Sequence, residues 1–170
     1  VVGGSGTGKS VLMRTIIGLN RPAAGSIEVF GEEVSAMSEA ERRRVQRRWG
    51  VLFQQGALFS SLTVGQNVEV PLREHTGLSA AARRELVALK LALVGLPPEA
   101  GAKYPSEISG GMKKRAGLAR ALALDAEILF LDEPTAGLDP IGAHRFDELI
   151  KTLQDTLGLT VVLVTHDLDT

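Results

Sequence analysis

The sequence contains no cysteine among its 170 residues. Disulfides, thiol nucleophiles and cysteine-based zinc sites are therefore excluded. Aromatic residues make up only 4%, too few for a surface on which nucleic-acid bases stack, and a formal net charge of −1 provides no excess of positive charge to hold a nucleic acid. The longest run of hydrophobic residues is four, so no segment is long enough to cross a bilayer.

The remaining composition is that of an ordinary globular domain, with 44% hydrophobic and 23% charged residues. Residues 128–131 and 161–164 are continuous apolar runs, typical of parallel strands buried on both faces. Residues 10–19, 80–96 and 110–124 carry helical patterns. Strands that alternate with helices predict an open α/β sheet.

Both ends of the sequence are expected to be cut. Val1 and Val2 precede a glycine-rich loop and have the character of the last residues of a strand. At the other end, only six residues follow Val164, and no helix remains to cover that strand. The sequence is therefore expected to be a fragment of a larger domain, truncated at both ends.

A phosphate-binding loop is predicted directly after Val2. Residues 3–10 fit the pattern G-x-x-x-x-G-K-[ST] and precede an amphipathic helix, which is the context that this pattern requires. Glycines let backbone N–H groups surround a phosphate, and the helix N-terminus faces the same anion. Lys9 is predicted to reach the β- and γ-phosphates, and the Ser10 hydroxyl to coordinate Mg²⁺. The predicted nucleotide-binding residues of the loop are Gly3, Gly4, Ser5, Gly6, Thr7, Gly8, Lys9 and Ser10.

Two carboxylates, Asp132 and Glu133, directly follow the apolar run 128–131. Ligands of open α/β sheets bind at the carboxyl ends of strands. Successive side chains of a strand point to opposite faces, so the two carboxylates can serve different tasks. Asp132 is suited to Mg²⁺, directly or through water, and Glu133 to polarising the attacking water as a general base.

Four further segments, taken with the loop and the acidic pair, resemble the ATP-binding-cassette (ABC) ATPase family. Residues 108–112, Ile-Ser-Gly-Gly-Met, are similar to the family's LSGGQ signature, and residues 136–139, Ala-Gly-Leu-Asp, to its D-loop. Gln54 matches the Q-loop glutamine and His166 the switch histidine. All of them appear in the family's order, which makes the set far more specific than any single motif.

The resemblance implies an α/β fold of the P-loop NTPase type, with a helical signature subdomain inserted into the core. The parts expected from it are a first core segment, a helical subdomain and a second core segment, over residues 1–58, 59–122 and 123–170. It also implies ATP and Mg²⁺ as cofactors, and ATP hydrolysis coupled to transport across a membrane as the activity.

The resemblance further assigns roles to single residues. Gln54 is expected to ligate Mg²⁺ or orient water, and His166 to bond the γ-phosphate and hold Glu133 and the water in place. Val11 replaces a threonine that is common in the family, which leaves its backbone N–H as the group that contacts nucleotide. The expected catalytic residues are thus Glu133, His166, Gln54 and Lys9, and the expected metal ligands are Ser10, Gln54 and Asp132.

A second phosphate-binding surface is expected at Ser109, Gly110 and Gly111, which offer a hydroxyl, backbone donors and a helix N-terminus. In the family this surface caps the γ-phosphate held by another protomer, and Asp139 of the D-loop is expected beside the nucleotide as well. The implied assembly is a head-to-tail dimer that encloses two ATP molecules. For Ser109 the alternative is a simple helix N-cap.

The local amino-acid sequences of residues 53–64, 71–75 and 4–14 are similar to those of the bacterial phospholipid-trafficking branch of the family, the Mla or Mkl (toluene-tolerance) type. That branch implies an integral-membrane permease of the MlaE type, an MCE-type lipid-binding protein, no nucleic-acid partner, and a cytoplasmic location on the inner membrane. The basic stretch Arg42–Arg48 is either a solvated helix face or a contact with anionic lipid or the permease.

Other members of the family remain alternatives to the lipid transporter. The chain can serve another importer or exporter, or it can be a ribosome-associated, non-transport cassette. A chromosome-organising or DNA-repair ATPase is excluded, because such proteins carry long coiled coils and only 99 residues lie between Lys9 and Ser109.

Overall fold

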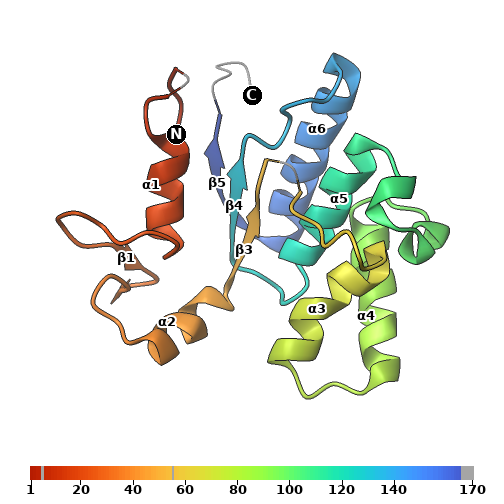
Figure 1. Cartoon of the computed structure of the whole chain (residues 1–170), viewed down its shortest axis with the longest axis horizontal. Coiled ribbons are helices and arrows are strands. Elements are labelled where there is room, and N and C mark those ends of the chain that lie inside the picture. The colour runs from red at the N-terminus through yellow and green to blue at the C-terminus, as the bar shows by residue number, and fades with distance from the viewer. Residues whose placement is uncertain (5, 55, 166–170) are drawn as a thin grey trace.

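The computed structural model describes residues 1–4, 6–54 and 56–165. A three-stranded parallel sheet lies at its centre, in the order β3 (Trp49–Leu52), β4 (Ile128–Asp132) and β5 (Thr160–Val164) (Figure 1). Leu52 pairs with Leu131, and Leu131 with Leu163, so the carboxyl ends of the three strands lie at one edge. The predicted open α/β sheet is confirmed.

Helices cover both faces of this sheet. Helix α1 (Lys9–Ile16) lies on one side, and α5 (Gly110–Ala121) and α6 (Pro140–Leu157) lie on the other (Figure 1). Phe130 packs into the apolar cluster on the α1 side, whereas its neighbours Leu129 and Leu131 pack into the α5–α6 side. The apolar run in β4 is therefore explained by burial on both faces.

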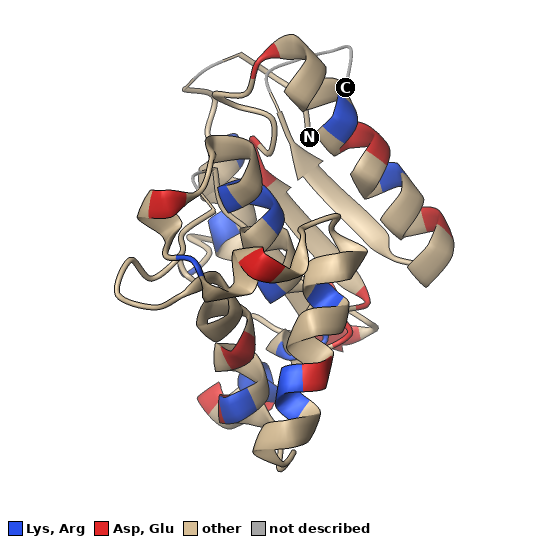
Figure 2. Cartoon of the chain, turned by 90° about the vertical axis from the view of Figure 1, so that its right-hand side faces the viewer, with Lys and Arg blue, Asp and Glu red and all other residues tan. Residues whose placement is uncertain are grey.

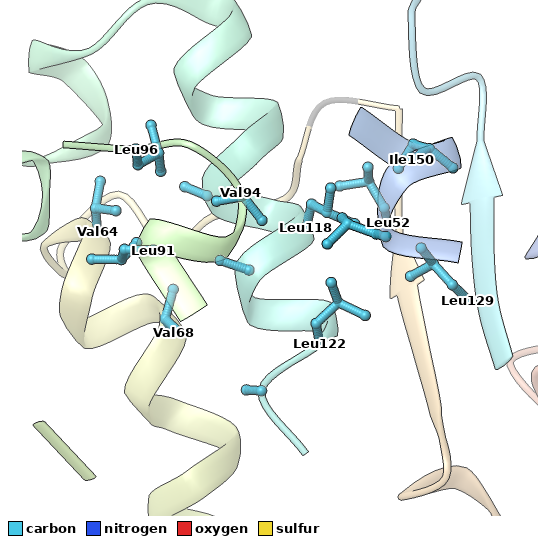
Figure 3. Packing of buried hydrophobic residues seen from close by; sticks show 14 of the residues in the cluster. Leu52, Val64, Val68, Leu91, Val94, Leu96, Leu118, Leu122, Leu129 and Ile150 are labelled. Atoms are coloured by element: carbon cyan, nitrogen blue, oxygen red, sulfur yellow. The ribbon is translucent and has the colours of Figure 1, made fainter. Parts of the chain in front are cut away.

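Helices α3 (Val64–His75) and α4 (Ala80–Leu93) form a layer outside α5, followed by two short 3₁₀ turns, η1 (Pro98–Ala102) and η2 (Pro105–Glu107). Figure 3 shows that one apolar cluster runs from this layer through α5 to β4 and α6. The cluster includes Val68 and Leu91 at one end and Leu129 and Ile150 at the other. The helical layer and the sheet thus share a core, and the division of the chain at residues 58 and 122 stays a prediction.

Several helices end before the predicted residue. Helix α4 ends at Leu93 and not at Leu96, because Gly95 takes a left-handed conformation (φ 69°) before the prolines are reached. Helix α1 likewise ends at Ile16, ahead of Gly18 (φ 84°). After α1 in the chain, strand β1 (Glu28–Val29) pairs antiparallel with β2 (Glu32–Glu33).

Charged side chains lie mainly on helices and loops. Strands β4 and β5 carry none apart from Asp132, as Figure 2 shows by their tan colour. The basic stretch lies in and just after α2 (Glu39–Gln46), where Arg43 pairs with Glu39 and Arg44 with Glu32. Within the described residues, no helix is long and apolar enough to cross a membrane.

Candidate active site

The glycine-rich loop curls around the end of the Lys9 side chain. The ammonium of Lys9 donates to the carbonyl oxygens of Gly3 (2.6 Å) and Gly4 (2.8 Å). Gly8 is the N-cap of α1 with φ 88° and gives the helix no side-chain cap, so the first N–H groups of α1 are open to a ligand. A Cβ at Gly6 or Gly8 would meet no atom within 4 Å, so the space in front of the loop is open.

Ser10 and Asp132 meet although they are far apart in the sequence. The Ser10 hydroxyl donates to Oδ1 of Asp132 at 2.8 Å, and Asp132 is only 4% exposed. The carboxylate stands at the carboxyl end of β4, next to the first turn of α1. The structure therefore brings the phosphate loop and the first acidic residue to the same edge of the sheet.

Gln54 and Glu133 face this loop across a shared cavity of about 470 Å³. Glu133 follows β4 directly, and its backbone N–H donates to Val164 of β5 at 2.9 Å. Its φ of 48° is unusual for a residue other than glycine. The cavity is lined by Gly6, Thr7, Gly8, Lys9, Ser10, Val11, Gln54 and Glu133.

The donor set at this cavity fits a hydrated Mg²⁺. Such an ion keeps several waters and binds one or two carboxylates plus phosphate oxygens, so it needs no cage of protein ligands. Among the residues that the structure describes, no group of three His, Cys, Asp or Glu could hold a metal by itself. Asp132, the Ser10 hydroxyl bonded to it and the nearby Gln54 have oxygen atoms that could ligate a nucleotide-bound ion.

The signature and D-loop residues line a second cavity, of about 390 Å³. The Ser109 hydroxyl accepts from the N–H of Met112 (3.2 Å) and caps α5, and Asp139 accepts from Gly142 (2.9 Å) and caps α6. Gly110 and Gly111 also line this cavity, and among the described residues it shares no lining residue with the first. Within the described part of one chain, the signature therefore lies in a different cavity from the phosphate loop.

Sequence reasoning missed Lys114, which contacts the backbone of both Gln54 and Glu133. The sequence offered no distinguishing signal, because Lys114 stands between Lys113 and Arg115 in a basic run, and its partners are visible only in three dimensions. The predicted site residues Ser5 and His166 lie outside the described residues.

A family model for the ABC transporter matches residues 1–136. The chain belongs to the ABC transporter family. Curated relatives include the probable ribonucleotide transport ATP-binding protein mkl of Mycobacterium tuberculosis, which is 46% identical over 99% of this chain and 47% of its own length. The intermembrane phospholipid transport protein MlaF of Haemophilus influenzae is 44% identical over 99% of this chain and 64% of its own.

The methionine import protein MetN of Caulobacter vibrioides is equally similar, with 46% identity over 99% of this ABC chain and 50% of its own length. The chain thus spans about half the length of curated relatives that it matches. Among solved structures, the ABC cassette MJ0796, in a dimeric post-hydrolysis state with ADP and Pi, has a TM-score of 0.89 and 33% identity. That match covers 99% of this chain and 74% of the cassette and confirms the predicted fold.

Proposed function

We propose that this chain is the ATP-binding and ATP-hydrolysing part of an ABC transporter. The observation that carries the proposal is the 2.8 Å hydrogen bond between Ser10 and Asp132, which joins the phosphate loop to the end of β4 beside Gln54 and Glu133. The proposed ligands of Mg²⁺ are Ser10, Asp132 and Gln54. When bound, the ion would neutralise charge on the β- and γ-phosphates.

Lys9 binds the phosphates in this proposal. Its ammonium now bonds two loop carbonyls, so a triphosphate in the loop offers it stronger, charged acceptors in the same place. Glu133 takes a proton from the attacking water. The water oxygen bonds to the γ-phosphorus while the bond from that phosphorus to the β–γ bridging oxygen breaks, and ADP leaves with the bridging oxygen. Gln54, on the other wall of the cavity, orients that water, and His166 is proposed to hold the γ-phosphate.

Two substitutions in the full-length protein test this assignment. Lys9→Ala should lose most ATP affinity, whereas Glu133→Gln should bind ATP normally and turn over very slowly. Nucleotide binding by calorimetry and phosphate release measure the two effects separately. Unchanged binding by Lys9→Ala would refute the loop assignment, and parental turnover by Glu133→Gln would refute the assigned base.

We also propose that two copies form the complete site, because the two cavities of one chain have no lining residue in common among those that the structure describes. Ser109, Gly110 and Gly111 of one copy would cap the γ-phosphate held by the other, with Asp139 close by. Mixing a Lys9→Ala chain with a Ser109→Arg chain places both lesions in one composite site and leaves the other intact. Some activity should return on mixing, and a mixture as inactive as each variant alone would contradict the shared site.

For the transported substrate, we propose phospholipid trafficking of the Mla type. The similarity to MlaF supports this branch. The similarity to the probable ribonucleotide transport protein mkl and to MetN keeps another importer or exporter as the alternative. The partners are then an MlaE-like permease in the inner membrane and an MCE-type lipid-binding protein. Genes for both next to this one, and phospholipid-stimulated ATPase activity in the reconstituted complex, would be expected. Stimulation by methionine with its binding protein would favour the alternative.

A groove of about 470 Å³ between β3 and α3 suits the permease. Apolar side chains such as Phe59 and Pro71 line it together with the basic Arg43 and Arg47. Phe59 is 53% exposed, which is unusual for a large aromatic residue. We therefore place the permease contact here, with an amphipathic segment of the permease as the occupant.

A further inference from the structure

Lys114, a basic residue that is almost fully buried, lies behind the proposed hydrolytic cavity. It stands in the middle of α5 and is 6% exposed. Its ammonium donates to the backbone oxygen of Gln54 at 2.9 Å and lies 3.4 Å from the backbone oxygen of Glu133. Burial lowers the pKa of Lys114, and the nearby charge of Glu133 opposes this shift without cancelling it. A buried ammonium is costly, so packing alone does not explain this residue.

The two oxygen atoms that Lys114 contacts belong to the two walls of the cavity. Gln54 follows β3 and Glu133 follows β4, and both line the space in front of the phosphate loop. Glu133 also holds a left-handed backbone conformation, with φ 48°, which persists only where neighbouring groups fix it. One ammonium therefore sets the separation between the backbones of these two residues.

Gly56 and Ala57, shortly after Gln54, are also hydrogen-bonded to helix α5. Arg120 of α5 donates to the carbonyl oxygens of Gly56 (3.1 Å) and Ala57 (2.9 Å), and Ala57 is another left-handed residue, with φ 47°. Gly117 permits this close approach, since a Cβ there would lie 2.9 Å from the Gly56 oxygen. Helix α5, which begins at the signature, is thus bonded to Gln54 through Lys114 and to Gly56 and Ala57 through Arg120.

We propose that Lys114 is a positioning residue that holds the backbones of Gln54 and Glu133 together on the signature helix and so sets the geometry of water attack. This inference rests on the proposed ATPase function. Lys114 is not among the residues that line the nucleotide cavity. Because Lys114 acts through Gln54 and Glu133, its loss lowers turnover far more than ATP affinity.

The test uses the full-length protein in the assembly in which the parental protein hydrolyses ATP. Lys114→Met keeps the length of the side chain and removes its donors, whereas Lys114→Arg keeps donors that can reach both oxygens. Lys113→Met is the matched control, because this lysine is the neighbouring residue on α5 and is more exposed. ATP affinity, kcat and thermal stability are measured for each variant.

We expect Lys114→Met to lower kcat by about 10- to 100-fold, the size of effect that a misplaced catalytic group produces. Its ATP affinity should change far less than kcat. Its melting temperature reflects two opposing effects, because a buried charge is removed and two backbone oxygens lose their donor, so kcat is compared at a temperature at which every variant is folded. Lys114→Arg should restore most of the rate, and Lys113→Met should resemble the parental protein. A parental kcat in Lys114→Met, or a loss of ATP affinity equal to the loss of kcat, would overturn the proposal.

A double variant separates positioning from general damage. If Lys114 acts through Glu133, then Lys114→Met should add nothing to the slow single turnover of Glu133→Gln, whereas independent effects would multiply. If Lys114→Met does not fold, Lys114→Gln takes its place in both comparisons, because the amide can reach one of the two oxygens. A parental protein that does not hydrolyse ATP refutes the proposed function, while normal turnover in the variants refutes this inference alone.

Discussion

Asn67→Ala should destabilise the protein far more than an ordinary surface substitution. Asn67 is fully buried at the start of α3. Its side-chain oxygen accepts from the N–H of Phe59 at 2.7 Å. Its amide nitrogen lies within hydrogen-bond distance of the carbonyl oxygens of Phe59 (3.1 Å), Leu62 (3.2 Å) and Thr63 (2.9 Å). One side chain thus fixes the whole turn that leads into α3.

The magnitude follows from counting hydrogens. The amide has two hydrogens for three carbonyl oxygens, so at most three full hydrogen bonds are made in all. At about 1 kcal/mol for each, and with backbone groups left unpaired, Asn67→Ala should cost about 3 kcal/mol of the free energy of unfolding. For a urea m-value of about 2 kcal/mol/M, the midpoint falls by about 1.5 M with m unchanged.

Gln66→Ala is the matched control, because Gln66 is the adjacent amide and accepts from the N–H of Thr63 (2.8 Å) in an exposed capping box. Its loss should cost about 1 kcal/mol. Urea unfolding of the full-length variants, followed by circular dichroism, measures both. Equal costs for the two substitutions, or a loss below about 1 kcal/mol for Asn67→Ala, would refute the reasoning from burial.

Three further predictions concern packing, acid stability and the permease groove. Gly50→Ala should cost about 3 kcal/mol in thermal unfolding, because its Cβ would lie 2.3 Å from the backbone oxygen of Ala121, whereas Gly77→Ala, which meets no atom within 4 Å, should be neutral. Hydrogen bonds from Ser38 lower the pKa of Glu41 below its ordinary value. The ionised Glu41 therefore stabilises the folded state, and this stabilisation is lost as pH falls through the lowered pKa, because the unfolded chain binds the proton more tightly. Glu41→Gln should therefore flatten the stability profile between about pH 5 and pH 3, and an unchanged slope would contradict the assignment. Phe59→Ser should leave the basal ATPase rate unchanged and weaken permease binding about tenfold in a pull-down titration, and unchanged binding would remove the groove as the docking surface.

The sheet and the meeting of distant site residues were predictable because both depend on simple patterns. An unbroken apolar run such as residues 128–131 is stable only when both faces are covered, and parallel strands bring their carboxyl ends to one edge. The approach of Asp132 to Ser10 then follows from the order of the elements. The same logic does not reach side chains that act from a neighbouring helix, which explains why Lys114 was missed.

Helix α3 was not located as a separate helix, because Pro71 lies inside it and proline is a signal against helix interiors. Burial of Val64, Val68 and Leu72 on one face outweighs that signal. A solvated helix face was one of the two interpretations of the basic stretch Arg42–Arg48, and most of that stretch lies in helix α2. The start of α2 was not assigned, although Ser38 followed by Glu41 is the pattern of a capping box.

The separation of the two cavities in one chain has a kinetic consequence. In the proposed dimer, bound ATP contacts both copies and stabilises their association. Hydrolysis of ATP removes this stabilisation. At low protein concentration, the ATPase rate per molecule should then increase with protein concentration, because two copies must associate. The increase should stop once nearly all copies are paired. A permease that holds two copies side by side would abolish this dependence on concentration, because the association of the two copies would then be intramolecular.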